Sequence, residues 1–358
     1  MIKEFSNGKL VLKKVLSLVI VFSFIFSAFA LTGCGKTDVG SKSAKAGQGS
    51  ESKGSDSKEN VTVRFGVMTT NIDHQIAMVG LEKGFFEDNG VDLQITEYAA
   101  GINTIDALVS DQLDIGIAAD FAFLNRVGNT KQNDLRLIAN YGDIAAQQLY
   151  VNPDEIKDID DIKGKRILNL TGTIWEYWNV LTAEYKGLSV DDVELVNVDS
   201  VANAIAIAQK GDADAFWASG DSAAKLADLG WVSILNIAEL DATTTLFFVA
   251  KDSYLAENSE AVEKFYKGFQ ETLDYINENQ EDAIKIINTK TGLSEDAIKA
   301  GLDAYDLGIM FKKDIYDYVD NVNKWLYENK YYDYEFDTKD YVDVSIAKKL
   351  YPDAVEID

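Results

Sequence analysis

The chain has few of several residue types on which common functional sites depend. Its 358 residues include one cysteine, one histidine and two prolines, and its 34 basic residues are outnumbered by 59 acidic ones. A single cysteine excludes an intramolecular disulfide, so the fold must be held by packing alone. A single histidine excludes a metal site made of several histidines and a Ser-His-Asp triad with a base to spare. The net charge of −25 makes nucleic acid and anionic membrane surfaces poor partners for the folded part.

The amino-terminal segment has the profile of a secretory signal. Lysines precede an uncharged apolar run from Val15 to Phe29. The run ends in Leu31-Thr32-Gly33-Cys34, which resembles the bacterial lipobox. The resemblance implies that residues 1–33 are a lipoprotein signal peptide and that Cys34 carries a diacylglyceryl group, which anchors the mature protein to the extracytoplasmic face of the cell membrane. The alternative is an uncleaved anchor helix, although the run is shorter than the ~20 residues that span a bilayer.

The segment that follows Cys34 is predicted to be a tether. Residues 34–60 are mostly Gly, Ser, Lys, Asp and Glu with almost nothing apolar, so they cannot bury enough surface to fold. We expect them to form a flexible link between the lipid and the folded domain.

From Val61 onward, short apolar segments alternate with helical ones, which predicts parallel sheets covered by helices. The pattern restarts after Gln147–Val151, so the chain contains two α/β modules, and the segment 243–250 is predicted to return to the first. The other predicted strands are 61–68, 91–98, 113–118, 135–141, 166–170, 193–198, 213–217 and 232–235. The predicted helices between them are 76–83, 101–110, 121–127, 173–185, 200–210 and 221–229. After Asn258 the pattern predicts only helices, at 259–278, 281–289, 294–305 and 313–328, before a mixed acidic tail.

Four stretches in this order are similar to one family of extracytoplasmic solute-binding proteins, which serves ABC importers of nitrate, alkanesulfonates, taurine and thiamine-pyrimidine precursors. They are Gly80-Leu81-Glu82-Lys83-Gly84-Phe85-Phe86 with Gly90-Val91-Asp92-Leu93, Ala107 to Gly116, Ile159 to Arg166, and Gly211-Asp212-Ala213-Asp214-Ala215-Phe216-Trp217. The second departs from the family pattern, because Asp111 stands where glycine is usual. The matches extend through most of the mature chain and follow a lipobox-like motif. Together they indicate the family more specifically than any one of them does.

The resemblance implies a two-lobed fold of the type II periplasmic-binding-protein kind, with helices at the carboxyl end. Lobe one would comprise residues 61–150 and 243–358, and lobe two residues 151–242. Such proteins are not enzymes and need no cofactor; they close around a solute between the lobes and deliver it to an ABC permease and its ATPase. We expect a monomer that captures a small organic solute.

Candidate ligand contacts lie at the carboxyl ends of strands, where open α/β sheets bind ligands. They are Thr70, Asn71, His74, Gly101, Asn103, Asp120, Phe121, Thr171, Thr173, Trp175, Trp217 and Asp221. Each has an alternative role as a helix cap, turn or core residue, and Thr173 and His74 illustrate this. Thr173 is placed to cap a helix, and His74 to satisfy a loop carbonyl. The resemblance favours Thr173, Asp120, Trp217 and Trp175 as contacts.

The charge of the solute is left open by these residues. Small hydroxyls and helix N-termini at Gly101 and Thr171 suit a nitrate or sulfonate oxyanion. Asp120 and Asp221 suit an amine, an amidine or a pyrimidine N–H, and the aromatic residues favour a small nitrogenous ring. A zwitterion such as taurine satisfies both patterns.

Two other functions are compatible with this sequence. A pyrimidine-synthase-like enzyme resembles the same lobes, but the family enzymes rely on histidine and a lysine-bound cofactor, and this chain combines one histidine with an export signal. A surface adhesin or sensory lipoprotein that kept the fold and lost transport is the other alternative.

Overall fold

The computed structural model of the protein describes residues 60–69, 71–132, 134–144 and 146–357. The predicted signal peptide, its lipidation site Cys34, most of the tether and the predicted contact Thr70 lie outside the described residues. Within the described part, no helix has the length and the apolar character needed to cross a membrane.

The first sheet has six strands in the order β11-β4-β10-β3-β1-β2. Their bounds are β1 Val61–Met68, β2 Val91–Tyr98, β3 Ile115–Ala119, β4 Leu135–Ile144, β10 Thr244–Lys251 and β11 Asp306–Met310. Strands β1 to β4 point the same way, whereas β10 is antiparallel to its neighbours β3 and β4, and β11 is antiparallel to β4. The helices that connect the first strands are α1 Ile72–Lys83, α2 Phe85–Asp88, α3 Gly101–Val109 and α4 Asp120–Thr130.

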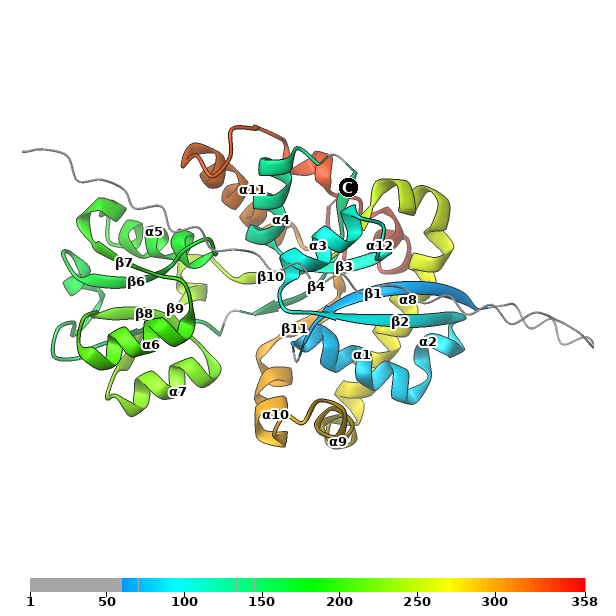
Figure 1. Ribbon diagram of the computed structural model, residues 1–358, viewed down its shortest axis with the longest axis horizontal. Coiled ribbons are helices and arrows are strands. Elements are labelled where there is room, and N and C mark those ends of the chain that lie inside the picture. Colours follow the sequence, from blue (N-terminus) through cyan, green and yellow to red (C-terminus); the bar gives the residue numbers. More distant parts are fainter. Residues whose placement is uncertain (1–59, 70, 133, 145, 358) are drawn as a thin grey trace, which may run out of the picture. The chain divides into compact units, whose positions relative to one another are not determined.

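The second sheet has five strands in the order β7-β6-β8-β5-β9. They are β5 Gln148–Val151, β6 Arg166–Leu170, β7 Glu194–Val198, β8 Ala215–Ala218 and β9 Val232–Asn236. Its helices are α5 Trp175–Tyr185, α6 Val201–Lys210 and α7 Gly220–Asp228, with short 3₁₀ turns η1 Ile159–Ile162, η2 Val190–Asp192 and η3 Ile237–Leu240. In Figure 1, α5 covers one side of these strands, and α6 with α7 covers the other. Only β5 runs against the direction of its sheet, so in each of the two sheets most strands point the same way.

The chain passes between the sheets twice, from β4 to β5 and from β9 back to β10 (Figure 1). The two crossing segments lie side by side, since the Thr243 hydroxyl donates to the Ile144 carbonyl at 3.1 Å and the Ile237 N–H donates to the Gln147 carbonyl at 2.9 Å. Two adjacent crossings are the arrangement that a two-lobed hinge requires.

The carboxyl-terminal part packs helices against the first sheet. It contains α8 Asp252–Glu278, α9 Gln280–Thr291, α10 Glu295–Ala304, α11 Lys313–Glu328, the 3₁₀ turn η4 Thr338–Tyr341 and α12 Ser345–Leu350. The prediction of helices alone after Asn258 is wrong at one place, because β11 adds a strand to the edge of the sheet. A short segment with a glycine at its centre has no strong strand pattern of its own, and pairing with β4 makes it a strand.

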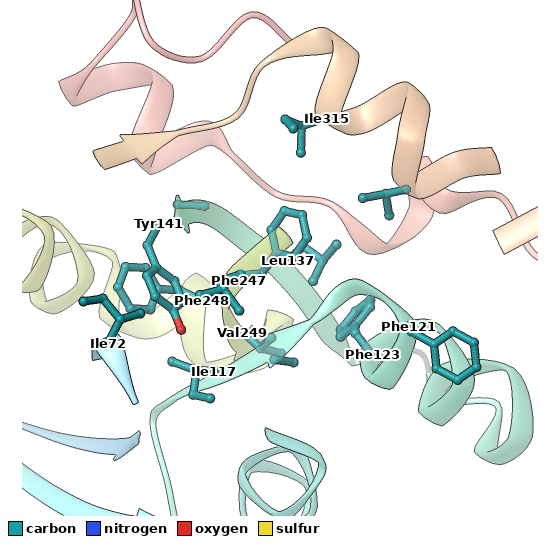
Figure 2. Close-up of a cluster of buried hydrophobic side chains, with 14 of the residues drawn as sticks. Ile72, Ile117, Phe121, Phe123, Leu137, Tyr141, Phe247, Phe248, Val249 and Ile315 are labelled. Atoms are coloured by element: carbon teal, nitrogen blue, oxygen red, sulfur yellow. The ribbon is translucent and has the colours of Figure 1, made fainter. Parts of the chain in front are cut away.

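The core of the first lobe forms on both faces of β10, whose consecutive phenylalanines point to opposite sides. Phe248 stacks on Tyr141 at 4.5 Å between ring centroids, as Figure 2 shows, and meets Phe269 of α8 edge-on at 4.9 Å. Phe247 packs at 5.1 Å against Phe311, which follows β11. Aromatic packing therefore holds β10, the strand that returns from the second sheet, in the first sheet. This packing fixes where the second crossing segment ends.

Candidate functional site

The carboxyl edge of the first sheet places several helix starts in one row. The N-termini of α1, α3 and α4 follow β1, β2 and β3, and the β4 end lies opposite the β10 start, where Asp143 pairs with Thr245. A sheet edge with this topology is where α/β proteins bind ligands. In this protein the edge is rich in buried carboxylates.

Asp120 is the first residue of α4, and its side chain is completely buried. Its carboxylate accepts the Phe121 N–H at 2.6 Å and the Thr245 hydroxyl at 3.0 Å. Burial raises the pKa of Asp120 to about 7, although these hydrogen bonds oppose the rise. Thr245 is the second residue of the returning strand β10, so this hydrogen bond joins Asp120 to the end of the second crossing.

Two further carboxylates of this edge have raised pKa values. Burial raises the pKa of Asp73 in α1 to about 6, against hydrogen bonds from the Met68 N–H at 2.7 Å and the Asn71 amide at 2.6 Å. Burial also raises the pKa of Asp143 to about 7, and the charge of Asp120 contributes to this rise. Three carboxyl groups at one sheet edge have raised pKa values, which means that their ionisation costs free energy. Such groups are a common sign of a binding site, because desolvated charge is tolerated where function needs it.

The other predicted contacts of the first lobe are spread along the same edge. His74 is 5 % exposed, and its Nε2 lies 3.8 Å from Glu97. Gly101 starts α3 so close to β3 that an added Cβ would lie 3.4 Å from the Ala118 Cα. Asn103 is exposed in the first turn of α3. These residues and Asn71 therefore lie near the strand ends, at the positions predicted from the sequence.

The loop after β6 uses its polar groups within the protein. The Thr173 hydroxyl donates to the Leu170 carbonyl at 2.6 Å and accepts the Trp175 N–H at 3.4 Å, so Thr173 bonds within the loop, while the N-cap position of α5 is Ile174. Gly172 has a φ of 77°, which favours glycine, and its N–H donates to the Glu176 carboxylate. Thr171 beside it is exposed.

The predicted aromatic contacts of the second lobe differ in exposure. Trp217 is fully buried, and its indole N–H donates to the Thr182 hydroxyl at 3.1 Å, so its side chain belongs to the core. Trp175 is half-buried, and its indole N–H donates to the Trp217 carbonyl at 2.8 Å. Asp221 lies in the first turn of α7.

Residues of α11 and the loop after it join the site, and the sequence analysis missed them. The Tyr331 hydroxyl donates to the second carboxylate oxygen of Glu176, and its ring meets Phe121 edge-on at 5.7 Å. Tyr318 accepts the Trp178 indole N–H at 3.3 Å. The high density of aromatic residues between Tyr316 and Tyr341 was the available signal, but no local pattern connects that segment to the strand ends.

A cavity of about 570 Å³ lies where α5, the second crossing and α11 meet. Tyr177 and Leu181 form one wall, and α11 forms another with Ile315 and Tyr318. The remaining lining residues are Ala238, Leu240, Asp241, Ala242, Thr243, Asp314, Asp317 and Asn321. The space has the size of a site for a small organic molecule.

Residues 71–283 match the family model described as NMT1/THI5 like, which covers more than half of the chain. The chain belongs to this family. Among curated relatives, a putative binding protein of Brucella abortus is 26% identical over 232 residues, covering 64% of this chain and 71% of the relative. The match to the family model therefore extends from the start of α1 to the first part of α9.

Solved structures share the fold of this family member. The periplasmic aliphatic sulphonate binding protein SsuA from Escherichia coli superposes with a TM-score of 0.67 at 19% identity, covering 78% of this chain and 91% of that one. The putative periplasmic sulfonate-binding protein SsuA from Methylobacillus flagellatus gives 0.69 at 17%, covering 82% and 95%. The desulfurization enzyme DszB gives 0.57 at 14%, covering 81% and 98%. The two-lobed α/β fold predicted from the sequence is confirmed, and the same fold also occurs in an enzyme.

Proposed function

We propose that this protein is the extracytoplasmic solute-binding component of an ABC importer, and that it is not an enzyme. The observation that carries the proposal is the cavity beside the second crossing segment, lined also by residues of α5 and α11. A solute at this place touches both lobes, and a ligand that bridges two lobes favours their closed arrangement. Family membership and the sulfonate-binding neighbours support the same role.

The solute we propose is a small organic molecule, either sulfonate- or taurine-like or thiamine-pyrimidine-like. Asp120, Phe121, Trp175 and the lining of the cavity are the proposed contacts, and the remaining predicted residues of the two edges shape the loops around them. Trp217 supports Trp175 through its backbone carbonyl. Delivery to a permease and ATPase, and action as a monomer, are part of this proposal.

Native mass spectrometry of protein purified without denaturation tests the proposal. We expect a co-purified small molecule, and we expect one chemical class in a panel of sulfonates, taurine, nitrate and pyrimidines to raise the melting temperature, because a ligand that binds only the native state stabilises it. A protein that carries no solute and responds to none of these classes contradicts the proposal and favours the adhesin or sensor alternative.

Lipid anchoring at Cys34 is proposed from the lipobox alone and has its own test. We expect the wild-type protein, expressed in a bacterium that processes lipoproteins, to fractionate with membranes, and the Cys34→Ala variant to lose this anchor. Equal distribution of both proteins between membrane and soluble fractions contradicts the proposed anchor and leaves solute binding unaffected.

A further inference from the structure

The loop after β6 has few hydrogen-bond donors to offer to an anion. A sulfonate or nitrate is held by N–H and O–H groups that point at its oxygens. In this loop the Gly172 N–H already donates to Glu176, and the Trp175 indole donates to the Trp217 carbonyl at 2.8 Å. The Thr173 hydroxyl donates to the Leu170 carbonyl at 2.6 Å. An oxyanion here must displace bonds that the protein makes with itself.

The opposite side of the site offers acceptors. The two oxygens of an ionised carboxylate have about four acceptor positions, and among the described residues those of Asp120 accept from the Phe121 N–H and from the hydroxyl and the N–H of Thr245. The charge of Asp120 is felt by Asp143, Tyr177 and Tyr318, so its surroundings are acidic. Lys312 also faces Asp143, but its ammonium is bonded to Asp306 at 2.9 Å.

The first crossing contributes an acceptor that lacks a partner. Gln147 is 8 % exposed, and its amide nitrogen donates to the Ser219 hydroxyl at 2.9 Å, at the carboxyl end of β8. Its Oε1 atom is buried without a hydrogen-bond partner among the described residues. Leaving a buried carbonyl oxygen unpaired is costly, so this atom needs a donor that the described residues do not supply, such as a water molecule or a solute.

The cavity has the same character. Three carboxylates, Asp241, Asp314 and Asp317, line it, of which Asp317 is paired with Lys313 at 2.5 Å, and the lining that the structure describes contains no lysine or arginine. Tyr177 and Tyr318, which belong to the lining, are also the side chains that feel the charge of Asp120. The cavity, the first crossing and the sheet edge thus each supply acceptors, and the cavity adds the rings of Tyr177 and Tyr318.

We infer that the solute is an organic cation, an amine or amidine on a flat apolar body, whose N–H groups bind the carboxylate of Asp120 and the acidic lining and whose body lies on the aromatic walls. This inference deepens the proposed function and rests on it. A charged N–H donor forms a stronger hydrogen bond to a carboxylate than a neutral donor does, and an ammonium or amidinium is attracted to tyrosine rings. A sulfonate of the same size meets like charge instead.

The first experiment compares ligands that share a ring and differ in charge. Benzamidine and benzylamine are tested against benzenesulfonate with the full-length protein, each at millimolar concentration, by differential scanning fluorimetry and isothermal titration calorimetry. We expect a concentration-dependent rise in melting temperature with a cation and none with the sulfonate. A rise with benzenesulfonate, or no rise with either cation, overturns the inference. The proposed function fails as well only if neither a cation nor any sulfonate, taurine, nitrate or pyrimidine binds.

The second experiment assigns the binding to Asp120. Asp120→Asn keeps the shape and the Phe121 contact, and Asp228→Asn on the exposed part of α7 is its control, because both variants replace one carboxyl group by an amide. We expect Asp120→Asn to weaken binding of the cation about tenfold or more, and Asp228→Asn to change it less than twofold. Equal affinities of the two variants overturn the role of Asp120. Circular dichroism establishes that each variant is folded, and the comparison of ligands on the wild-type protein holds without any variant.

Discussion

Asp111 and Gly211 occupy the same place in two copies of one local motif. In each lobe a strand arginine binds an aspartate at 2.6 Å, Arg64 in β1 with Asp114 and Arg166 in β6 with Asp214. The arginine also donates to the carbonyl three residues before that aspartate, which is Asp111 in one lobe and Gly211 in the other. Both carbonyls belong to residues with positive φ, 58° and 75°. The position requires a left-handed backbone, which explains why glycine is usual there.

Exchanging these two residues tests that backbone requirement. Gly211→Ala is expected to lower the free energy of unfolding by about 1 kcal/mol, because a side chain in the left-handed region is strained even where space is free. Asp111→Gly is expected to raise stability, since the exposed pair of Asp111 with Lys251 contributes little. Urea unfolding measures both. A loss of stability in Asp111→Gly contradicts this account.

Asp120 makes stability depend on pH in a definite direction. Its pKa is about 7 in the folded protein and ~3.9 in an unfolded chain, so the folded state holds the proton more tightly. The contribution is fully present below about pH 4 and is lost as the pH rises toward 7. Asp143, Tyr177 and Tyr318 face Asp120. The raised pKa of Asp143 also makes the free energy of unfolding fall as the pH rises.

We therefore expect Asp120→Asn to become more stable relative to the wild-type protein as the pH rises from 4 to 7. Asparagine imitates the protonated acid and has no proton to lose. Thermal melts of both proteins at several pH values, without ligand, measure the difference. A constant difference across this range would mean that Asp120 titrates normally in the folded protein.

At the scale of elements, α11 is the helix that joins the carboxyl-terminal part to the second lobe. Trp178 is fully buried in α5, and its indole N–H has Tyr318 of α11 as its acceptor. Tyr177 packs against Trp325 of α11 at 5.2 Å between ring centroids. These contacts make α11 a wall of the cavity and a link between the lobes.

Removing the Tyr318 hydroxyl is expected to destabilise the protein by about 1–3 kcal/mol, because Tyr318→Phe leaves a buried indole N–H without an acceptor. Tyr316→Phe on the same helix is the control, since its ring is only half-buried, and we expect almost no change. Urea unfolding of the two variants decides. Equal stability of both would show that the bond between α5 and α11 contributes nothing.

Elements that form through local interactions can be predicted from the sequence, whereas elements that depend on distant parts of the chain cannot. Strands β1, β2 and β6 have the predicted bounds, because a buried strand between turn residues is a local pattern. Strand β11 escaped prediction because its partner β4 lies far back in the chain. The burial of Trp217 could not be predicted because it depends on α5, and the place of Tyr318 at the cavity depends on equally distant contacts. The place of Asp120 at a strand end could be predicted, since it directly follows an apolar strand, and its contact with a solute stays a prediction.

At the scale of the whole molecule, the two crossing segments and α11 place opposite demands on motion. The crossings permit the two sheets to rotate, whereas the contacts of Tyr318 and Tyr331 with α5 hold the lobes together. In this structure Asp120 is closed off from solvent, so a solute reaches it only after neighbouring side chains move. If Asp120 is a contact as we propose, we expect opening to precede binding and the solute then to stabilise the closed arrangement through contacts with both lobes.

Hydrogen exchange with and without a bound solute tests this sequence of events. We expect the solute to slow exchange in the first turns of both α4 and α5 and in α11, because one ligand bridges elements of both lobes. The central strands β3 and β8 serve as the internal reference, since their amides are already protected by pairing. Protection confined to α4 would mean that the ligand sits on one lobe without closing the other over it. Protection spread evenly over the chain would report global stabilisation by mass action rather than closure at the hinge.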